Sequence, residues 1–407
     1  MKFERCVIYY IIIVYSVILY FFVNDKTQYV PMLAIMYVSP FLLLFKFFKV
    51  IQKGEYLIYI TALNILMTYV WHAHEFRLNT VAYSLMFIST YLYYIKVLNK
   101  RFFSLEDYFK LLSFIIKAYA IVLVTQQLSV IAHIPVFNQC WEFSENRFKL
   151  NSLSIEPSNT SLIVTVIMFS LVKIRELRIG RKYNILQDYK NEKFQWISYF
   201  YIQFTSGSLA AIFAVLVFLM YMIEKKYIFR CLIFLFIVGM VAVFFINDNL
   251  LNRISILLPA IMTFDVNYLY NIDESSSARI APYILYFRDF NLFDINTWVG
   301  YGCDYGKTYL TIGILGYLPD DDQGVGGVIN FLYDYGLIST IPMFIYIYKL
   351  SYSKYKFDFI LYLLLFTIVP FNHYVTWIYM ILIFTNWYFF AKSNLSLKVH
   401  KNENGIH

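Results

Sequence analysis

Long apolar runs recur along the chain, and they constrain its fold more than any other feature. A helical crossing of a bilayer core takes about 20 predominantly apolar residues. Of the 407 residues, 60% are hydrophobic and only 15% are charged, whereas soluble proteins carry roughly a quarter charged residues. The chain is therefore predicted to be an all-α polytopic membrane protein, which excludes a soluble enzyme, a disordered chain and a nucleic-acid-binding domain. About twelve spans are expected, near 6–23, 30–48, 56–71, 80–98, 109–131, 158–174, 194–205, 208–223, 228–246, 328–348, 357–371 and 374–391.

The first apolar run has two interpretations. Lys2 and Arg5 precede it, as in a signal peptide. It has no small-residue cleavage site before Asn24, so we interpret it as a first span.

Basic residues predict the orientation of the spans. With the N-terminus inside, most of the 34 lysines and arginines fall on inner segments, as the positive-inside rule requires. Both termini are therefore expected in the cytoplasm. The net charge of +8 is explained by membrane orientation and gives no reason to expect nucleic acid as a partner.

The same topology divides the chain into alternating membrane and loop segments. Spans one to five occupy 1–131, a first large outer loop 132–157, spans six to nine 158–246, a second large outer loop 247–327, spans ten to twelve 328–391, and a cytoplasmic tail 392–407. The second loop is rich in aromatic residues and glycines, which favours an ordered loop with short helices. The runs at 194–205 and 208–223 are each short, and a hairpin turning at Ser206-Gly207-Ser208 keeps both flanking basic loops inside.

Ionisable residues are scarce within the predicted spans. Only Lys117 and Asp334 fall inside them, the latter near an outer end. Ion-coupled carriers usually place such groups at membrane depth. Chemistry at the outer membrane boundary, and hence an enzyme, is therefore favoured over a carrier.

Glu156 is a candidate catalytic residue where the first outer loop meets a span. Pro157 suits a first helical turn, and Ser154 or Ser158 is suited to cap that helix. One interpretation is therefore a well-formed helix start, with Glu156 favourably placed at the positive end of the helix dipole. The other makes Glu156 a general base or a ligand of a sugar hydroxyl.

Arg279 and Arg288 are candidate anion-binding residues in the second outer loop. Arginine is scarce on this side, and its guanidinium group matches phosphate oxygens in a bidentate manner. The alternative is that both arginines pair with Asp273, Glu274 or Asp289 on a solvated loop, which would contribute little. The two interpretations remain open.

The remaining polar motifs are weaker. Asp320-Asp321-Asp322 could bind a divalent cation, but no second ligand cluster accompanies it, so no metal and no cofactor is predicted. Four histidines fall at outer span ends without metal-site spacing, and His373 is a weak acid/base candidate. Cys140 and Cys303 share the outer side, so a disulfide between them stays open. The residues in question are His72, His74, His133, His373, Cys140 and Cys303.

Several short motifs in order resemble a known superfamily, the Wzy-type O-antigen and capsule repeat-unit polymerases with their O-antigen ligase relatives. The matching pieces cover roughly 140–340. They are Arg147 with Glu156-Pro157-Ser158, Thr205-Ser206-Gly207-Ser208, Ser276-Ser277-Ala278-Arg279, Gly300-Tyr301-Gly302, and Asn330 with Tyr335-Gly336-Leu337.

This resemblance implies a GT-C-like, all-helical glycosyltransferase of the bacterial cytoplasmic (inner) membrane. Such an enzyme joins undecaprenyl-pyrophosphate-linked oligosaccharide repeats on the outer leaflet and uses no nucleotide sugar. By this analogy Arg279, Arg147 and Arg288 hold the pyrophosphate, which leaves during transfer, and Glu156 orients or deprotonates the acceptor. A flippase and a chain-length regulator are candidate protein partners.

Two alternatives are carried with this hypothesis. Ligases of the superfamily share a His-Asn pair before the late glycine, where this chain has Gln323-Gly324-Val325, so a polymerase is favoured over a ligase. The second alternative is a lipid-linked oligosaccharide flippase or a polysaccharide export protein. A carrier of that kind is expected to show halves related by an internal repeat, and none is visible by inspection.

Overall fold

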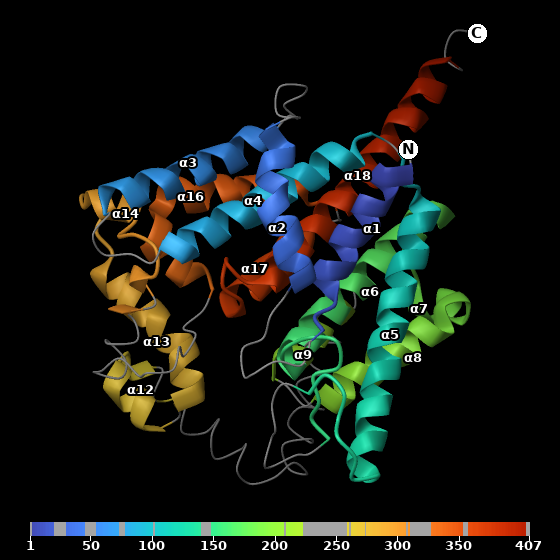
Figure 1. The fold of residues 1–407 in the computed structure, drawn as a ribbon, viewed down its shortest axis with the longest axis horizontal. Helices are drawn as coiled ribbons and strands as arrows, with labels where there is room; N and C mark the ends of the chain where they lie inside the picture. The colour runs from blue at the N-terminus through green and yellow to red at the C-terminus, as the bar shows by residue number, and fades with distance from the viewer. Residues whose placement is uncertain are drawn as a thin grey trace.

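The computed structural model describes most of the chain and forms a bundle of helices (Figure 1). The described residues are 2–19, 30–44, 54–72, 78–100, 102–139, 148–206, 209–222, 259, 262–272, 274–306, 308–309, 327–352 and 357–403, and they contain no strand. The predicted span near 228–246 lies outside them. Every other predicted span overlaps a helix of the described residues, while the number of membrane crossings stays a prediction.

The helices follow the apolar runs closely. They are α1 (Lys2–Ser16), α2 (Val30–Leu44), α3 (Glu55–Trp71), α4 (Leu78–Leu98), α5 (Leu105–Ile131), α6 (Pro157–Ile179), α7 (Ile185–Asp188), the 3₁₀ helix η1 (Tyr189–Glu192), α8 (Lys193–Ser206), α9 (Leu209–Met222), α12 (Val266–Ile272), α13 (Glu274–Asp289), α14 (Ile295–Val299), α16 (Val328–Leu350), α17 (Phe357–Ile368) and α18 (Tyr374–Glu403). Among the described residues, α4, α5, α16 and Tyr374–Ala391 of α18 are long and apolar enough to cross a membrane.

The surface of the bundle is apolar in the way a lipid-facing surface requires. Leu63, Met67 and Val70 repeat at helical spacing on α3 and are 61%, 54% and 71% exposed. Phe114 and Ile121 on α5 are similarly exposed. Exposed apolar patches of this extent are rare on soluble monomers, so the finding supports a membrane-embedded protein.

Polar side chains link the helices in the interior. Because lipid is as apolar as the side chains, helices in membranes associate through close packing and interhelical hydrogen bonds. Ser39 Oγ lies 2.7 Å from Thr90 Oγ1 between α2 and α4, and Asn386 of α18 donates to Ser170 Oγ of α6 over 3.0 Å. Trp377 of α18 is fully buried in this core.

Residues near the predicted hairpin confirm that the chain reverses there. Trp196 of α8 stacks on Phe218 of α9 with ring centroids 5.8 Å apart. In one continuous helix these residues would be about 33 Å apart. Both helices also pack on α6. The turn residues Gly207 and Ser208 lie outside the described part of the chain.

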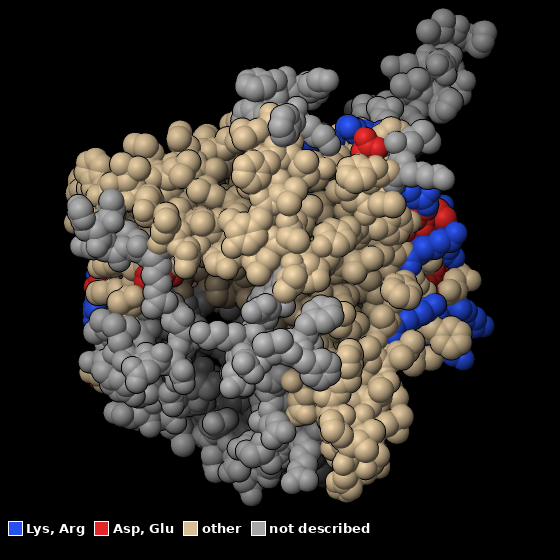
Figure 2. Space-filling model, viewed as in Figure 1, with Lys and Arg blue, Asp and Glu red and all other residues tan. Residues whose placement is uncertain are grey.

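Charged residues gather at the two ends of the bundle. The beginning of α1 and the end of α18 lie together at one end, here named the terminal end (Figure 1). The opposite end, here named the loop end, carries α12, α13, α14 and residues 300–306. On the face shown in Figure 2, blue and red atoms crowd the terminal end, a smaller group lies at the loop end, and the described surface between them is free of charge.

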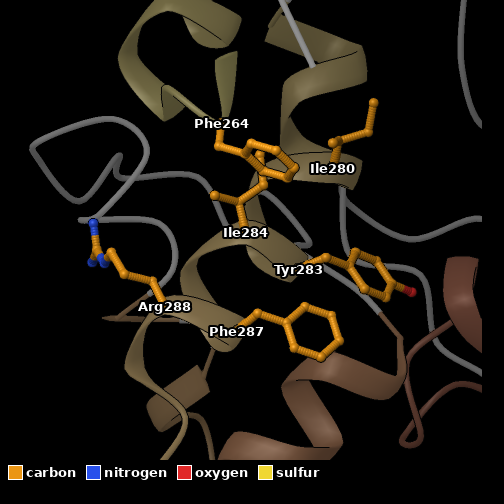
Figure 3. Close-up of a pocket in the computed structure, with 6 residues that line it drawn as sticks. All are labelled: Phe264, Ile280, Tyr283, Ile284, Phe287 and Arg288. Carbon is orange, nitrogen blue, oxygen red and sulfur yellow. The ribbon is translucent and has the colours of Figure 1, made fainter. Parts of the chain in front are cut away.

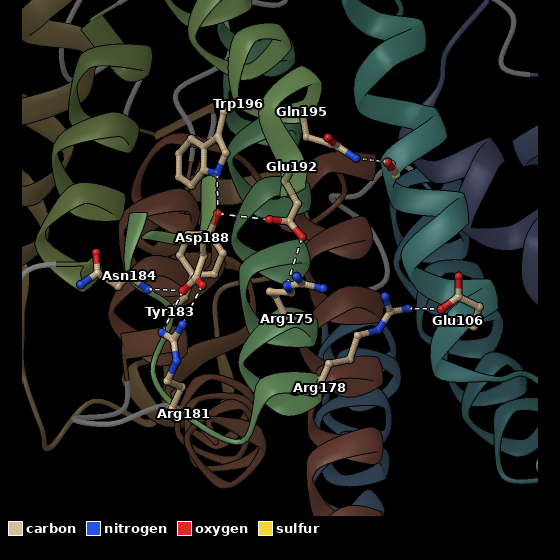
Figure 4. Close-up of polar contacts among 11 residues, drawn as sticks. Glu106, Arg175, Arg178, Arg181, Tyr183, Asn184, Asp188, Glu192, Gln195 and Trp196 are labelled. Atoms are coloured by element: carbon tan, nitrogen blue, oxygen red, sulfur yellow. Dashed lines mark hydrogen bonds and ion pairs between the residues drawn. The ribbon is translucent and has the colours of Figure 1, made fainter. Parts of the chain in front are cut away.

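Ion pairs hold the terminal end together (Figure 4). Arg181 forms a bidentate pair with Asp188 at 2.7 and 2.9 Å, and these hydrogen bonds lower the pKa of that carboxyl. Arg178 bridges α6 to Glu106 at the start of α5. The basic residues of this end are thus largely engaged within the protein, as expected for a structural, membrane-orienting role.

Candidate active site at the loop end

The loop end is organised by a break in α16. Gly336 has φ 62° and ψ −172°, which interrupts the helical backbone. The preceding carbonyl groups are thereby turned toward the second predicted outer loop. The backbone N–H groups of Tyr301 and Gly302 donate to the carbonyls of Tyr333 and Asp334 over 2.8 and 3.0 Å.

Two glycines make this contact possible. A Cβ on Gly300 would lie 2.4 Å from the carbonyl oxygen of Asp334, and one on Gly336 would lie 2.4 Å from that of Trp298. Both distances are far below van der Waals contact. Two of the motifs that the sequence suggested separately, Gly300-Tyr301-Gly302 and Tyr335-Gly336-Leu337, therefore pack directly against each other.

Polar residues of α3 fix the same junction from the other side. Asn64 Nδ2 donates to the carbonyls of Val299 and Tyr335 over 3.0 and 2.8 Å. Thr68 Oγ1 also donates to the carbonyl of Val299, over 2.9 Å. The end of α14 is thus bound to both α3 and α16.

The segment after Gly302 is anchored by buried groups. The carboxylate of Asp334, which is 8% exposed, accepts from the N–H of Gly306 over 2.8 Å. Cys303 is 1% exposed, its Sγ lies 3.1 Å from the hydroxyl of Tyr335, and burial raises the pKa of this thiol. Asp304 adopts a left-handed φ of 66° and accepts from Thr80 Oγ1 over 2.7 Å. These contacts hold residues 302–306 against α4 and α16.

A cluster of tyrosines covers the anchored segment. Tyr301, Tyr305 and Tyr309 stack as nearly parallel rings, with centroids 4.7 and 5.6 Å apart and interplanar angles of 14° and 8°. All three are partly buried, and all three contact the ring of Tyr333, which is 4% exposed. The stack therefore rests on α16.

Two carboxylates flank the tyrosine stack. The hydroxyl of Tyr301 donates to Asp294 over 2.6 Å, and this bond lowers the pKa of the Asp294 carboxyl. The hydroxyl of Tyr309 donates to Asp289 over 2.6 Å. Partial burial raises the pKa of Asp289, but the hydrogen bonds from Arg288 and Tyr309 outweigh it, so the net shift is downward. Both carboxyls are therefore ionised at neutral pH.

An apolar groove lies along α13 (Figure 3), and its lining residues Tyr283 and Ile284 pack in the same small core as the tyrosine cluster. It has a volume of about 580 Å³ and is lined by Phe264, Ile280, Tyr283, Ile284, Phe287 and Arg288. Arg288 is the charged residue of this lining, and its side chain is 62% exposed and extends away from Tyr283 and Phe287 (Figure 3). Its Nε lies 3.0 Å from Asp289 Oδ1. The arrangement offers apolar surface to a hydrocarbon chain and one cation to an anionic group.

The pairing of Arg288 with Asp289, which belongs to one of the two interpretations left open by the sequence, is thus present. Arg279 lies in α13, but its side chain is outside the described part of the structure, as are Arg147 and Asp320-Asp321-Asp322. The roles proposed for these residues stay predictions. In α13 Arg279 precedes Arg288 by two and a half turns, which places the two positions on opposite sides of the helix.

Glu156 begins α6 as the sequence suggested, with a change in the capping residue. Glu156 itself is the N-cap and Pro157 follows in the first turn, whereas Ser154 or Ser158 was expected to cap. The exposed carboxylate accepts from Ser158 Oγ over 2.9 Å. No hydrogen bond or ion pair within the described residues joins Glu156 to α13, so its role as a base stays a prediction.

The other candidates are placed as follows. Among the described residues no group of His, Cys, Asp and Glu could hold a metal ion. Cys303 is a free thiol, and Cys140 lies outside the described residues. Burial lowers the pKa of His373 to about 4, so this imidazole is neutral at pH 7. Lys117 is exposed on α5.

Sequence reasoning missed the tyrosine stack, Asp294 and Asn64, and it named Asp289 only as a possible partner of the arginines. A signal for the stack was present, because Tyr301, Tyr305 and Tyr309 recur every four residues, the spacing of one helix face. Asn64 was also visible as an amide within an otherwise apolar span.

Comparison of the chain with models of known protein families, with curated proteins and with solved structures gives no match.

Proposed function

We propose that this protein is a membrane glycosyltransferase that joins polyprenyl-pyrophosphate-linked oligosaccharide repeats into a surface polysaccharide. In this proposal the loop end faces the outside of the bacterial cytoplasmic membrane and the terminal end faces the cytoplasm. The positive-inside rule supports this orientation, because the basic segments lie at the terminal end.

The observation that carries the proposal is the apolar groove with Arg288 beside it. A polyprenyl pyrophosphate combines a long hydrocarbon chain with a dianionic or trianionic group. The lining of Phe264, Ile284 and Phe287 suits the hydrocarbon, and a guanidinium group suits phosphate oxygens.

Arg288 supplies electrostatic catalysis in this proposal. Negative charge develops on the pyrophosphate as the bond from the donor sugar to its phosphate oxygen breaks. A cation aimed at that oxygen stabilises the transition state more than the ground state. Arg279 and Arg147 remain candidates for the same group, and Glu156 remains the candidate that orients or deprotonates the acceptor hydroxyl.

The buried charges favour this enzyme over a carrier. Asp334 is committed to the backbone of Gly306, and Lys173 is paired with Glu176 at the other end of the bundle. Both groups serve the structure, whereas a carrier needs ionisable groups along a path through the membrane. A flippase, an export protein and a ligase are the alternatives that the test must separate.

The test reconstitutes the purified protein in vesicles with lipid-linked repeat units. Elongation supports the proposal, translocation of unpolymerised repeats indicates a flippase, and transfer to a different acceptor indicates a ligase. If the protein catalyses neither elongation nor transfer, the enzymatic hypothesis is refuted.

Variants then test Arg288 itself. Arg288→Ala is expected to reduce elongation at least tenfold while the protein still inserts, since loss of one preorganised charge contact of this kind typically costs more than that. Arg181→Ala is the matched control, because it removes an arginine–aspartate pair from the terminal end. Equal elongation in both variants would remove Arg288 from the mechanism.

A further inference from the structure

We propose that Tyr301, Tyr305 and Tyr309, with Asp289 and Asp294, form a saccharide-binding surface beside the groove. We name these five residues the tyrosine platform. The assignment of an oligosaccharide as ligand rests on the proposed function, but binding can be measured without any transfer reaction.

The chemistry of the platform suits a sugar chain. An aromatic ring carries partial negative charge on its face, which attracts the slightly positive C–H groups of a pyranose ring. The nearly parallel rings of the stack have centroids 4.7 and 5.6 Å apart, so they are offset and each neighbour covers only part of a face. An ionised carboxylate has about four acceptor sites for hydroxyl donors. Asp289 uses some of these sites for Arg288 and Tyr309, and its side chain is 32% exposed, so acceptor capacity remains for a ligand.

The order of the contacts matches the order of groups in a lipid-linked oligosaccharide. The groove adjoins Arg288, and Arg288 binds Asp289 at 3.0 Å. From Asp289 the contacts continue to Tyr309 and through the ring stack to Tyr301, whose hydroxyl binds Asp294. Hydrocarbon, phosphate and sugars would thus meet apolar, cationic and aromatic–acidic surfaces in succession.

The position of the platform is fixed before any ligand binds. Tyr333 supports the stack from a buried position in α16, and Asp334 and Gly302 hold the backbone beneath it. Less conformational freedom is therefore lost on binding. A purely structural role for the same tyrosines would give the same packing, so the experiment must separate the two.

The binding experiment uses the full chain in lipid nanodiscs and saturation-transfer difference NMR. The probes are lipid-free oligosaccharides released by mild hydrolysis from the surface polysaccharide of the host cell. Tyr305→Leu is the main variant, because Tyr305 is the centre of the stack. Tyr286→Leu is the control, because Tyr286 contacts Tyr333 edge-on at 5.2 Å in the same small core but is not part of the platform.

We expect Tyr305→Leu to weaken binding by about tenfold, as for loss of one aromatic contact, and Tyr286→Leu to leave it within about twofold of wild type. Asp294→Asn, which keeps the size of the side chain, is also expected to weaken binding. Thermal unfolding of each variant reports any general loss of stability.

The outcomes separate the platform from the enzyme. Wild-type binding that depends on Tyr305 supports the platform even if no elongation is observed. Absence of oligosaccharide binding by the wild type, or equal loss in Tyr305→Leu and Tyr286→Leu, overturns the platform even if elongation is observed.

Discussion

Replacing Gly336 with alanine would place a methyl group where α16 meets the end of α14. The new Cβ would lie 2.4 Å from the carbonyl oxygen of Trp298 and 2.6 Å from the backbone nitrogen of Gly300. Neither neighbour is the end of a flexible side chain, so the two backbone segments must separate.

The cost can be worked out from two contributions. A non-glycine residue at φ 62°, ψ −172° is strained by about 1–3 kcal/mol. Separation also removes the two hydrogen bonds from Tyr301 and Gly302, each worth about 0.5–1.5 kcal/mol. The loop end is therefore destabilised by about 2–6 kcal/mol, while the packing of the remaining helices is retained.

The buried thiol of Cys303 reports this local opening directly. It is 1% exposed, so a maleimide reacts only when the segment lifts from α16. If the free energy of local opening falls by about 3 kcal/mol, the labelling rate of Cys303 rises about 100-fold. The measurement uses a chain in which Cys6, Cys140 and Cys231 are serine.

Gly180→Ala is the matched control. Gly180 also has a positive φ, 68°, but a Cβ there meets nothing within 4 Å, and it ends α6 near the terminal end. We expect Cys303 to be labelled at the wild-type rate in this variant. If Gly336→Ala also labels at the wild-type rate, the close approach of the two segments does not hold the loop end in place.

Three further predictions concern burial, pH and orientation. Glu55→Gln removes the carboxylate that pairs with the Lys96 cation, whose side chain is 9% exposed. The free energy of unfolding should fall by about 3–5 kcal/mol. Thermal unfolding in detergent should show partial recovery of stability when Lys96→Met is added. Because the pKa of His373 is lowered to about 4 in the folded state, the unfolded state binds more protons between pH 6.5 and 4. Stability should therefore fall as the pH falls through that window, and His373→Gln should abolish this dependence. A cysteine in place of Phe293, which is 99% exposed, should react with an impermeant thiol reagent on intact cells. A cysteine in place of Tyr189 should react only after permeabilisation. The reverse pattern would overturn the proposal that the loop end faces the outside of the membrane.

The membrane helices could be predicted because their signal is local. An apolar run long enough to cross a bilayer specifies a helix wherever it lies, and the observed ends differ from the expected ones by a few residues in most cases. Two of the differences at helix ends have physical causes. Helix α18 continues to Glu403, beyond its apolar run, because a helix need not stop at the membrane surface. Helix α17 ends at Ile368, before Pro370, which disfavours helical conformation in the residue preceding it.

The loop end could not be predicted in the same way, because its contacts join residues distant in the chain. Nothing in the local sequence indicates that Gly300 packs on Gly336, or that Asn64 of α3 binds the carbonyl of Val299. The arginine candidates were found by their scarcity on the outer side, and Glu156 by its place before Pro157 at the start of a span. Neither feature predicts which of these residues lie together. Arg288 and Asp289 were the pair that this approach could find, since they are adjacent in sequence.

The exposure of that pair gives Arg288 a different capacity from a buried cation such as Lys96. The ion pair between Arg288 and Asp289 is open to solvent, with side chains 62% and 32% exposed. Such exposed pairs contribute about 0–1 kcal/mol to the free energy of unfolding. An incoming phosphate with more charge and a bidentate geometry can therefore displace Asp289 at little cost. Lys96, by contrast, is held in a buried pair with Glu55, and exchange there would leave a buried charge without its partner. Weak pairing thus leaves Arg288 available for an anion. When an anion replaces Asp289 as the partner of Arg288, the freed carboxylate oxygen of Asp289 can accept a hydrogen bond from a ligand on the adjacent tyrosine platform.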